Sequence, residues 1–115
     1  MRNAVATAVF ALGTPALLWA DADGPDYYRA RDVPAGEVLP IRADPDPEAK
    51  LLAAIPPDGD GIRNLLCEGR LSFAEWEASS EAERVAAADR VWCRVEHRGI
   101  TGWAQGRYLA EGSPP

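Results

Sequence analysis

The sequence has a single histidine, His97, and lacks the motifs that usually carry catalysis. No Gly-x-Ser-x-Gly segment presents a serine nucleophile, and Cys67 and Cys93 lie too far apart for a Cys-x-x-Cys redox motif. His97 stands between Glu96 and Arg98, where the sequence predicts a turn. Because catalysis needs a nucleophile or a base held by an orienting group, we predict no catalytic residue and no enzyme activity.

Patterns typical of metal and cofactor sites are also missing. Neither cysteine has a second ligand nearby in the sequence, and His97 follows Cys93 by four residues without a partner cluster. Acidic residues in segment 44–48 resemble the start of a calcium loop. An EF-hand requires Gly at position six and Glu at position twelve, where Ala49 and Ile55 stand. We therefore predict no metal and no cofactor.

The chain has no excess of basic residues. It holds 12 Lys and Arg against 18 Asp and Glu, which gives a formal net charge of −6 at pH 7. Binding to nucleic acid depends largely on Lys and Arg that contact phosphates, and this composition offers no such footprint. Nucleic acid and anionic lipid are therefore not the expected partners.

The first 22 residues have the pattern of a secretory signal peptide. Arg2 precedes an apolar run, and the small residues Ala20 and Ala22 follow it, so cleavage is expected after one of these two. The alternative is a membrane anchor, which Gly, Thr and Pro at 13–15 disfavour in a run already near the lower length limit. Cleavage predicts a periplasmic or secreted protein with no remaining membrane association.

Export gives the two cysteines a structural meaning. An even number of cysteines in a small exported domain usually forms disulfides, so we predict a Cys67–Cys93 bond in preference to free thiols or a metal site. Closing a loop of about 25 residues contributes on the order of 3 to 4 kcal/mol in the chain-entropy model. That is a large share of the net stability of a small domain.

The remaining pattern is mainly β, with a helical insert at 71–89. Ser80 and Glu83 form a capping box within this insert, and the segments DPDP and PPDGDG predict loops. His97-Arg98-Gly99 predicts a hairpin turn. Five or six short strands of a small barrel or sandwich are predicted, with 27–33 the weakest candidate. The segments are 27–33, 38–43, 51–55, 62–67, 91–96 and 100–104.

Three segments resemble the bacterial SH3-like domain family. Segment 38–45, VLPIRADP, is similar to its L-N-(V/I)-R-x-x-P strand, and segment 52–56 to its (V/I)-x-x-(I/L)-P strand. Trp92 together with segment 102–109, GWAQGRYL, is similar to its closing W-x-x-V…G-W-(V/A)-x-x-x-Y-L motif. The resemblance covers about 28–109.

This resemblance implies a small SH3-like β-barrel at 28–111, after a flexible lead at 23–27 and before a tail at 112–115. Pro40 replaces the family's usual Asn, and a cysteine pair with a helical insert is not general to the family, which suggests an exported subgroup. The implied function is a non-catalytic binding module for a peptide, a peptidoglycan component or an envelope protein. The alternative is an assembly accessory of an envelope protein that binds no small ligand.

Aromatic residues are the candidate ligand contacts. SH3-like folds use exposed rings with acidic neighbours to bind extended peptides, and we expect Tyr28, Trp92 and Tyr108 to form a partly exposed patch. Trp76 is expected to anchor the insert to the barrel. No catalytic or metal-binding residue is assigned.

Two further packing expectations concern single residues in the predicted strands. Ile41 should face inward and Arg42 outward, where Arg42 can pair with Asp44. Gly102 should leave room for the indole of Trp103 on a tightly curved strand.

Overall fold

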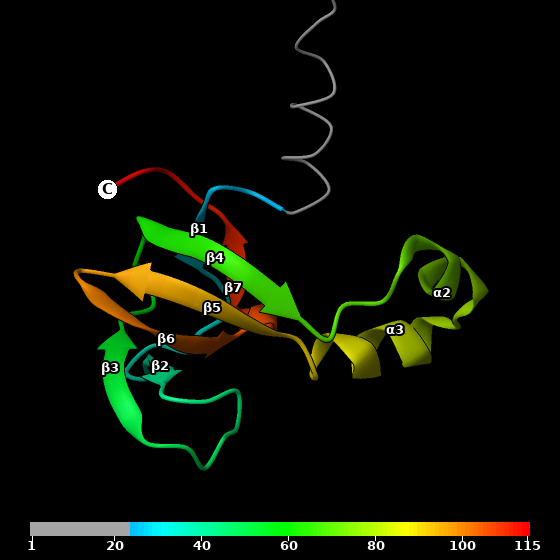
Figure 1. Cartoon of the computed structure of the whole chain (residues 1–115), viewed down its shortest axis with the longest axis horizontal. Helices are drawn as coiled ribbons and strands as arrows, with labels where there is room; N and C mark the ends of the chain where they lie inside the picture. Colours follow the sequence, from blue (N-terminus) through cyan, green and yellow to red (C-terminus); the bar gives the residue numbers. More distant parts are fainter. Residues whose placement is uncertain (1–23) are drawn as a thin grey trace, which may run out of the picture.

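Seven antiparallel strands form one curled sheet in the computed structural model, which describes residues 24–115. The sheet order is β3-β2-β6-β5-β4-β1-β7. The mainly β fold, a small barrel-like sheet with a helical insert, is therefore confirmed (Figure 1). The predicted signal peptide at 1–22 lies outside the described residues. The strands are β1 Tyr27–Ala30, β2 Leu39–Arg42, β3 Leu51–Ile55, β4 Ile62–Glu68, β5 Trp92–His97, β6 Ile100–Gln105 and β7 Leu109–Glu111.

Strand β7 has only three residues and was not predicted. It follows a short 3-10 helix, η2, at Gly106–Tyr108, and pairs with β1 through Ala30 and Leu109. Because β1 also pairs with β4, this first strand is covered on both edges and lies within the sheet. None of the helices described in residues 24–115 is long and apolar enough to span a bilayer.

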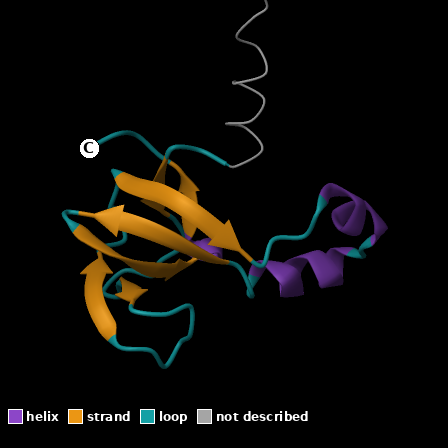
Figure 2. Ribbon diagram, viewed as in Figure 1, coloured by secondary structure: helices purple, strands orange, loops and turns teal. Residues whose placement is uncertain are grey.

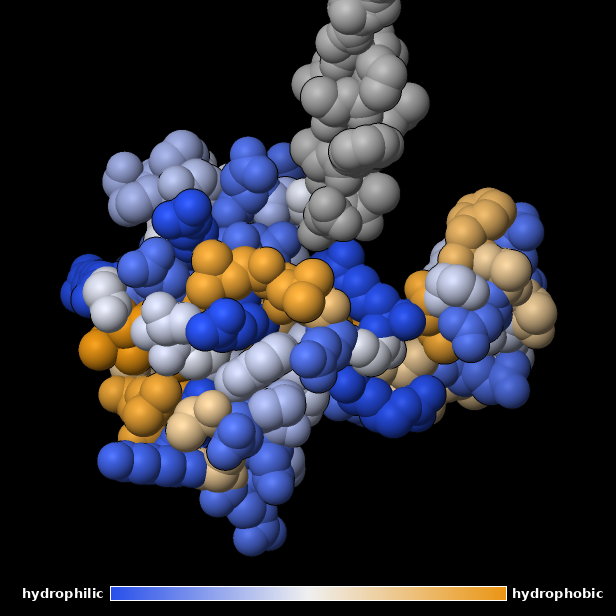
Figure 3. Space-filling view, viewed as in Figure 1, coloured by the Kyte–Doolittle hydropathy of each residue, from blue (hydrophilic) through white to orange (hydrophobic). Residues whose placement is uncertain are grey.

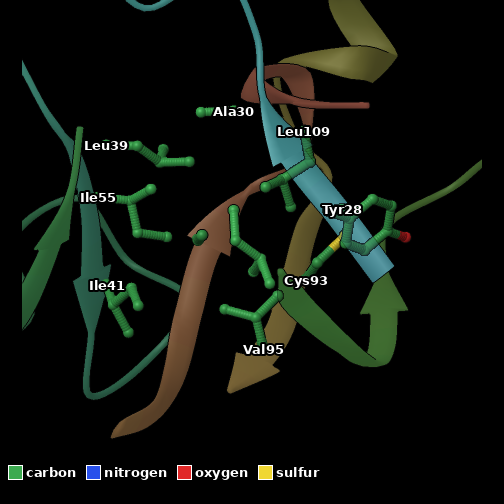
Figure 4. Close-up of a cluster of buried hydrophobic side chains, with 10 residues drawn as sticks. Tyr28, Ala30, Leu39, Ile41, Ile55, Cys93, Val95 and Leu109 are labelled. Carbon is green, nitrogen blue, oxygen red and sulfur yellow. The ribbon is translucent and has the colours of Figure 1, made fainter. Parts of the chain in front are cut away.

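The core fills the concave side of the sheet, and every strand contributes to it (Figure 4). Alternation along the strands places Ile41 inward in β2, and Cys93 and Val95 inward in β5, as predicted. Burial of these apolar side chains is the main favourable term in folding. The buried cluster consists of Tyr28, Ala30, Leu39, Ile41, Ile55, Ile62, Cys93, Val95, Ala104 and Leu109.

The predicted β5–β6 hairpin is confirmed. His97 and Ile100 face each other as its last pair, and the two residues between them make the turn. Arg98 has φ 52° and Gly99 has φ 81°, so both adopt the left-handed conformation that two-residue hairpin turns favour.

Gly102 is required for a different reason from the one expected. A Cβ at this position would lie 2.6 Å from Cγ2 of Ile41 and 2.7 Å from the carbonyl oxygen of Arg42. Gly102 therefore makes room for the neighbouring strand β2 and not for Trp103. The strands β2 and β6 approach closely here because no side chain separates them.

The expected Arg42–Asp44 ion pair is also wrong. Nη1 of Arg42 donates a hydrogen bond to the carbonyl oxygen of Ala49 at 2.9 Å. The side chain thus spans the proline-rich loop that joins β2 to β3, where Pro45 and Pro47 offer no backbone donors. A backbone carbonyl, and not a carboxylate, is its partner.

The insert consists of two short helices, α2 Phe73–Ala78 and α3 Glu81–Ala88, which extend away from the sheet (Figure 2). The predicted capping box at Ser80 and Glu83 is present, and Ser72 with Glu75 forms a second one. Each box satisfies otherwise free backbone N–H groups from within its own helix. The two helices therefore begin at positions that their local sequence specifies.

The predicted disulfide joins Cys67 and Cys93 where the insert leaves the sheet. These residues are direct cross-strand partners in β4 and β5. The bond closes the loop that contains both helices.

Trp76 does not anchor the insert to the barrel, which corrects the prediction. Its side chain is 48% exposed, and the guanidinium of Arg84 lies 3.6 Å from the centroid of its ring. Nε of Arg84 also donates a hydrogen bond to the carbonyl oxygen of Trp76 at 2.9 Å. Trp76 therefore joins α2 to α3.

Replacing both Cys67 and Cys93 with Ala should lower the free energy of unfolding by about 3 to 4 kcal/mol, because the denatured chain regains the freedom of the closed loop. Urea denaturation followed by tryptophan fluorescence measures this change. Mass spectrometry of the wild-type protein with and without reductant provides the control for the oxidised state. An unchanged midpoint in the double variant would contradict the structural role of the bond.

Gly102→Ala should destabilise the protein by about 1–3 kcal/mol, because overpacking forces β2 and β6 apart. Thr101→Ala is the matched control, since Thr101 is the exposed neighbour in the same strand. Thermal unfolding should show a lower melting temperature for Gly102→Ala alone. Equal melting temperatures would show that the sheet accommodates the methyl group.

Candidate functional site

The predicted aromatic patch does not form as a partly exposed surface. Tyr28 is only 3% exposed and Trp92 only 9%, so this expectation is wrong for both. The ring of Tyr28 fills the core beside the disulfide, and its hydroxyl lies 3.2 Å from Sγ of Cys67 (Figure 4). Trp92 lies on the face of β5 opposite Cys93 and Val95 and is buried there. Burial removes both rings from the candidate ligand contacts, whereas Tyr108 is half-buried.

Tyr108 lines an open cleft of about 240 Å³ beside the segment that leads into β2. The 3-10 helix η2 turns the chain after β6 and places this residue at the edge of the sheet. The carbonyl oxygen of Tyr108 accepts a hydrogen bond from the backbone N–H of Arg31 at 2.9 Å, which fixes the backbone. The other residues around the cleft are Val33, Pro34, Glu37, Val38, Leu39, Pro40 and Gln105.

The chemistry of the Tyr108 cleft is aromatic and apolar with one carboxylate. Val38 lines the same cleft and is exposed, and Pro34 and Pro40 add rigid apolar surface. Glu37 supplies a negative charge and Gln105 an amide that can donate and accept. These groups have the chemistry to accept an apolar side chain and an adjacent cation.

A larger open cavity, about 680 Å³, lies at the tip of the β5–β6 hairpin and contains His97. Three of its charged groups, Asp60, Arg63 and Glu96, interact with one another or with the backbone. Nη1 of Arg63 lies 3.7 Å from Oε1 of Glu96, and Oδ1 of Asp60 accepts backbone hydrogen bonds from Gly61 at 2.7 Å and Ser113 at 2.9 Å. The Tyr108 cleft, by contrast, combines an aromatic ring with the exposed side chains of Glu37 and Val38.

Asp60 holds the C-terminal segment against this cavity. The backbone N–H groups of Ser113 and Gly61 hold the pKa of its carboxyl below the ordinary value, with a smaller contribution from the charge of Arg29. The backbone N–H of Gly112 donates to the carbonyl oxygen of Tyr27 at 2.9 Å, next to this contact. As a result, Pro114 and Pro115 form one wall of the cavity.

No metal-binding cluster occurs in the described part of the chain: across 24–115, no three His, Cys, Asp or Glu residues lie close enough together to hold an ion. His97 sits half-buried at the end of β5, beside the hairpin turn. Its neighbours in the cavity wall include Arg98 and Gly99.

Several large apolar side chains are exposed on the insert and on the sheet. Phe73 in α2 is 74% exposed and Val85 in α3 is 61% exposed. Leu65 and Leu66 of β4 are also exposed, and Figure 3 shows apolar surface on both the barrel and the insert. Exposed apolar side chains that cluster on a surface are typical of contact sites for other molecules.

Sequence reasoning identified Tyr108 but missed the rest of its cleft. Val33, Pro34, Glu37 and Val38 belong to the connection between β1 and β2. Val33 and Val38 lie outside the observed strands, although the predicted strands 27–33 and 38–43 included them. The available signal was the pair of prolines, Pro34 and Pro40, on either side of Glu37. Comparison with protein-family models, with characterised proteins and with solved structures found no match to this chain.

Acidification should release the C-terminal segment from Asp60. A carboxyl whose pKa is lowered in the folded state stabilises the fold above its ordinary pKa, and this contribution is lost as the pH falls through the folded-state pKa. The amide resonance of Ser113 should therefore titrate with a midpoint below 3.8, the ordinary value for Asp60. Asp60→Asn keeps an acceptor oxygen without the charge, so its Ser113 resonance should not show this step. A wild-type midpoint at or above 3.8 would contradict the contact.

Proposed function

We propose that this protein is an exported, non-catalytic binding module that recognises an extended peptide segment in the bacterial cell envelope. The observation that carries the proposal is the Tyr108 cleft, where a half-buried ring, two prolines and the carboxylate of Glu37 line one open surface. The ligand is a segment of an envelope protein or a peptidoglycan stem peptide.

The cleft suits an extended peptide for a geometric reason. In an extended or polyproline II chain, side chains on one side recur at short, regular intervals, so a shallow groove can accept them without a deep pocket. Tyr108 and Val38 would contact an apolar side chain, and Glu37 would attract a neighbouring Lys or Arg. Recognition of extended segments by aromatic-lined grooves follows the same principle.

The proposed location rests on two observations. The disulfide between Cys67 and Cys93 is compatible with an oxidising compartment. The apolar N-terminal pattern at 1–22 independently predicts a signal peptide. Together they support a periplasmic or secreted protein, and the resemblance to bacterial SH3-like domains supports an envelope ligand.

A role as an assembly accessory is the second candidate, and the insert favours it. Phe73 and Val85 project large apolar side chains from two helices that extend away from the barrel (Figure 2). In this role a partner protein would cover the insert, and the Tyr108 cleft would remain empty.

Tyr108→Ala should weaken binding about tenfold or more, because removal of an aromatic anchor typically costs 2 kcal/mol or more at a recognition site. Binding is measured by co-sedimentation with purified peptidoglycan and on an array of envelope-protein peptides. Tyr27→Ala is the matched control, since Tyr27 is also half-buried but lines the hairpin cavity.

Binding measurements and co-purification with the same variants distinguish the two candidate functions. Loss of binding in Tyr108→Ala with retention in Tyr27→Ala supports the peptide-binding module. Co-purification of an envelope protein that is abolished by Phe73→Ser with Val85→Ser, and is unaffected by Tyr108→Ala, would replace it with the assembly role.

A further inference from the structure

Three arginines from distant parts of the sequence line one hollow of about 200 Å³ at the root of the insert. Arg31 follows β1, Arg70 follows β4, and Arg107 belongs to η2. The lining also includes the apolar residues Val91 and Leu109. Residues of strongly hydrophilic type gather on the surface where the barrel meets the insert (Figure 3).

The concentration of positive charge is unusual for a chain with a net charge of −6. Arg107 is paired with the carboxylate of Asp89. Arg31 and Arg70 form no ion pair within 4.0 Å with any residue in the described range 24–115. Two guanidinium groups therefore face this hollow without a carboxylate partner among those residues.

Hydrogen bonds hold these side chains in place while leaving donors available. Nε of Arg31 donates to the carbonyl oxygen of Arg107 at 3.2 Å. Nη2 of Arg70 donates to the hydroxyl of Tyr28 at 3.1 Å and lies 3.3 Å from Sγ of Cys67. A guanidinium carries five N–H donors, so each side chain keeps several for a ligand. Fixed arginines lose less conformational entropy on binding than free ones.

A second hollow, of about 270 Å³, adjoins the first and shares Arg70, Ala88 and Val91 with it. Its other residues are mainly apolar and include Leu71 and Trp76. A ligand that spans both hollows would place an anionic group near the arginines and an apolar group beside Leu71 and Trp76.

We propose that the two adjoining hollows bind a carboxylate attached to a small apolar group, such as the C-terminal residue of a peptide. The planar guanidinium matches a carboxylate, which can accept two parallel hydrogen bonds from it. The neighbouring apolar hollow selects the side chain next to that carboxylate. This site neighbours the Tyr108 cleft, since the guanidinium of Arg107 lies 5.1 Å from the centroid of the Tyr108 ring, but the two share no lining residue. The proposal does not depend on the function proposed for the cleft.

The test uses N-acetyl-leucine as the probe and N-acetyl-leucinamide as its uncharged match, with the full disulfide-bonded protein. N-acetyl-leucine should produce saturable shifts of the amide resonances of Arg70 and Val91, and the amide should not. Raising the salt concentration should weaken binding, because the attraction is electrostatic. Equal affinity for the two probes would overturn the carboxylate assignment.

Arg70→Gln should weaken binding of N-acetyl-leucine about tenfold, as expected for the loss of a charged hydrogen-bonding partner. Arg94→Gln is the matched control, because Arg94 is an exposed arginine of β5 that lines neither hollow. Arg31→Gln provides a second variant that leaves the Tyr28 contact intact, and it should weaken binding as well. Unchanged affinity in both Arg31→Gln and Arg70→Gln would refute the site.

Two further probes test the nature of the ligand. Acetate should bind more weakly than N-acetyl-leucine, because it leaves the apolar hollow empty. Equal affinity for acetate would overturn the role of Leu71 and Trp76. Phenyl phosphate should also bind more weakly, and a clear preference for it would reassign the site to a phosphate group.

Discussion

The covalent bond between Cys67 and Cys93 is the constraint on which most of the structure depends. Cys93 belongs to the buried core, whereas Cys67 is half-buried and lies beside the hydroxyl of Tyr28. The bond joins β4 to β5 where the insert begins, so it connects the interior of the barrel with the arm outside it. Arg70, three residues after Cys67, also contacts the disulfide, since its Nη2 lies 3.3 Å from Sγ of Cys67. The core, the insert and the hollow lined by three arginines therefore all meet at this disulfide.

Features with a local cause were predictable from the sequence. The hairpin turn at Arg98 and Gly99 and the capping box at Ser80 and Glu83 each depend on residues within a few positions of one another. Strand positions were predicted from the alternation of apolar and polar residues. This pattern shows which residues share a face, but not which other strands pack against that face. Tyr28 shows this limit, because β1 lies between β4 and β7 and its ring is enclosed by residues distant in the sequence. Gly102 shows it again, since the strand that requires its missing side chain is β2.

The candidate binding surfaces were less predictable for the same reason. Tyr108 was identified as a candidate contact, but its cleft is completed by the connection between β1 and β2, which forms neither helix nor strand. The hollow lined by Arg31, Arg70 and Arg107 brings together arginines that are far apart in the sequence. The net negative charge of the chain gave no indication that they would meet. Trp76 was expected to contact the barrel because large aromatic side chains are usually buried. A cation from the adjacent helix covers its ring instead.

The insert carries its own stabilising contacts, and the ion pair of Asp89 with Arg107 ties its end to the barrel. Ser72 and Ser80 begin its helices, and the pair of Trp76 and Arg84 joins them. The disulfide holds its two ends together at one place on the sheet. Evolution or protein engineering can therefore substitute a different insert between the two cysteines while the barrel keeps its own core.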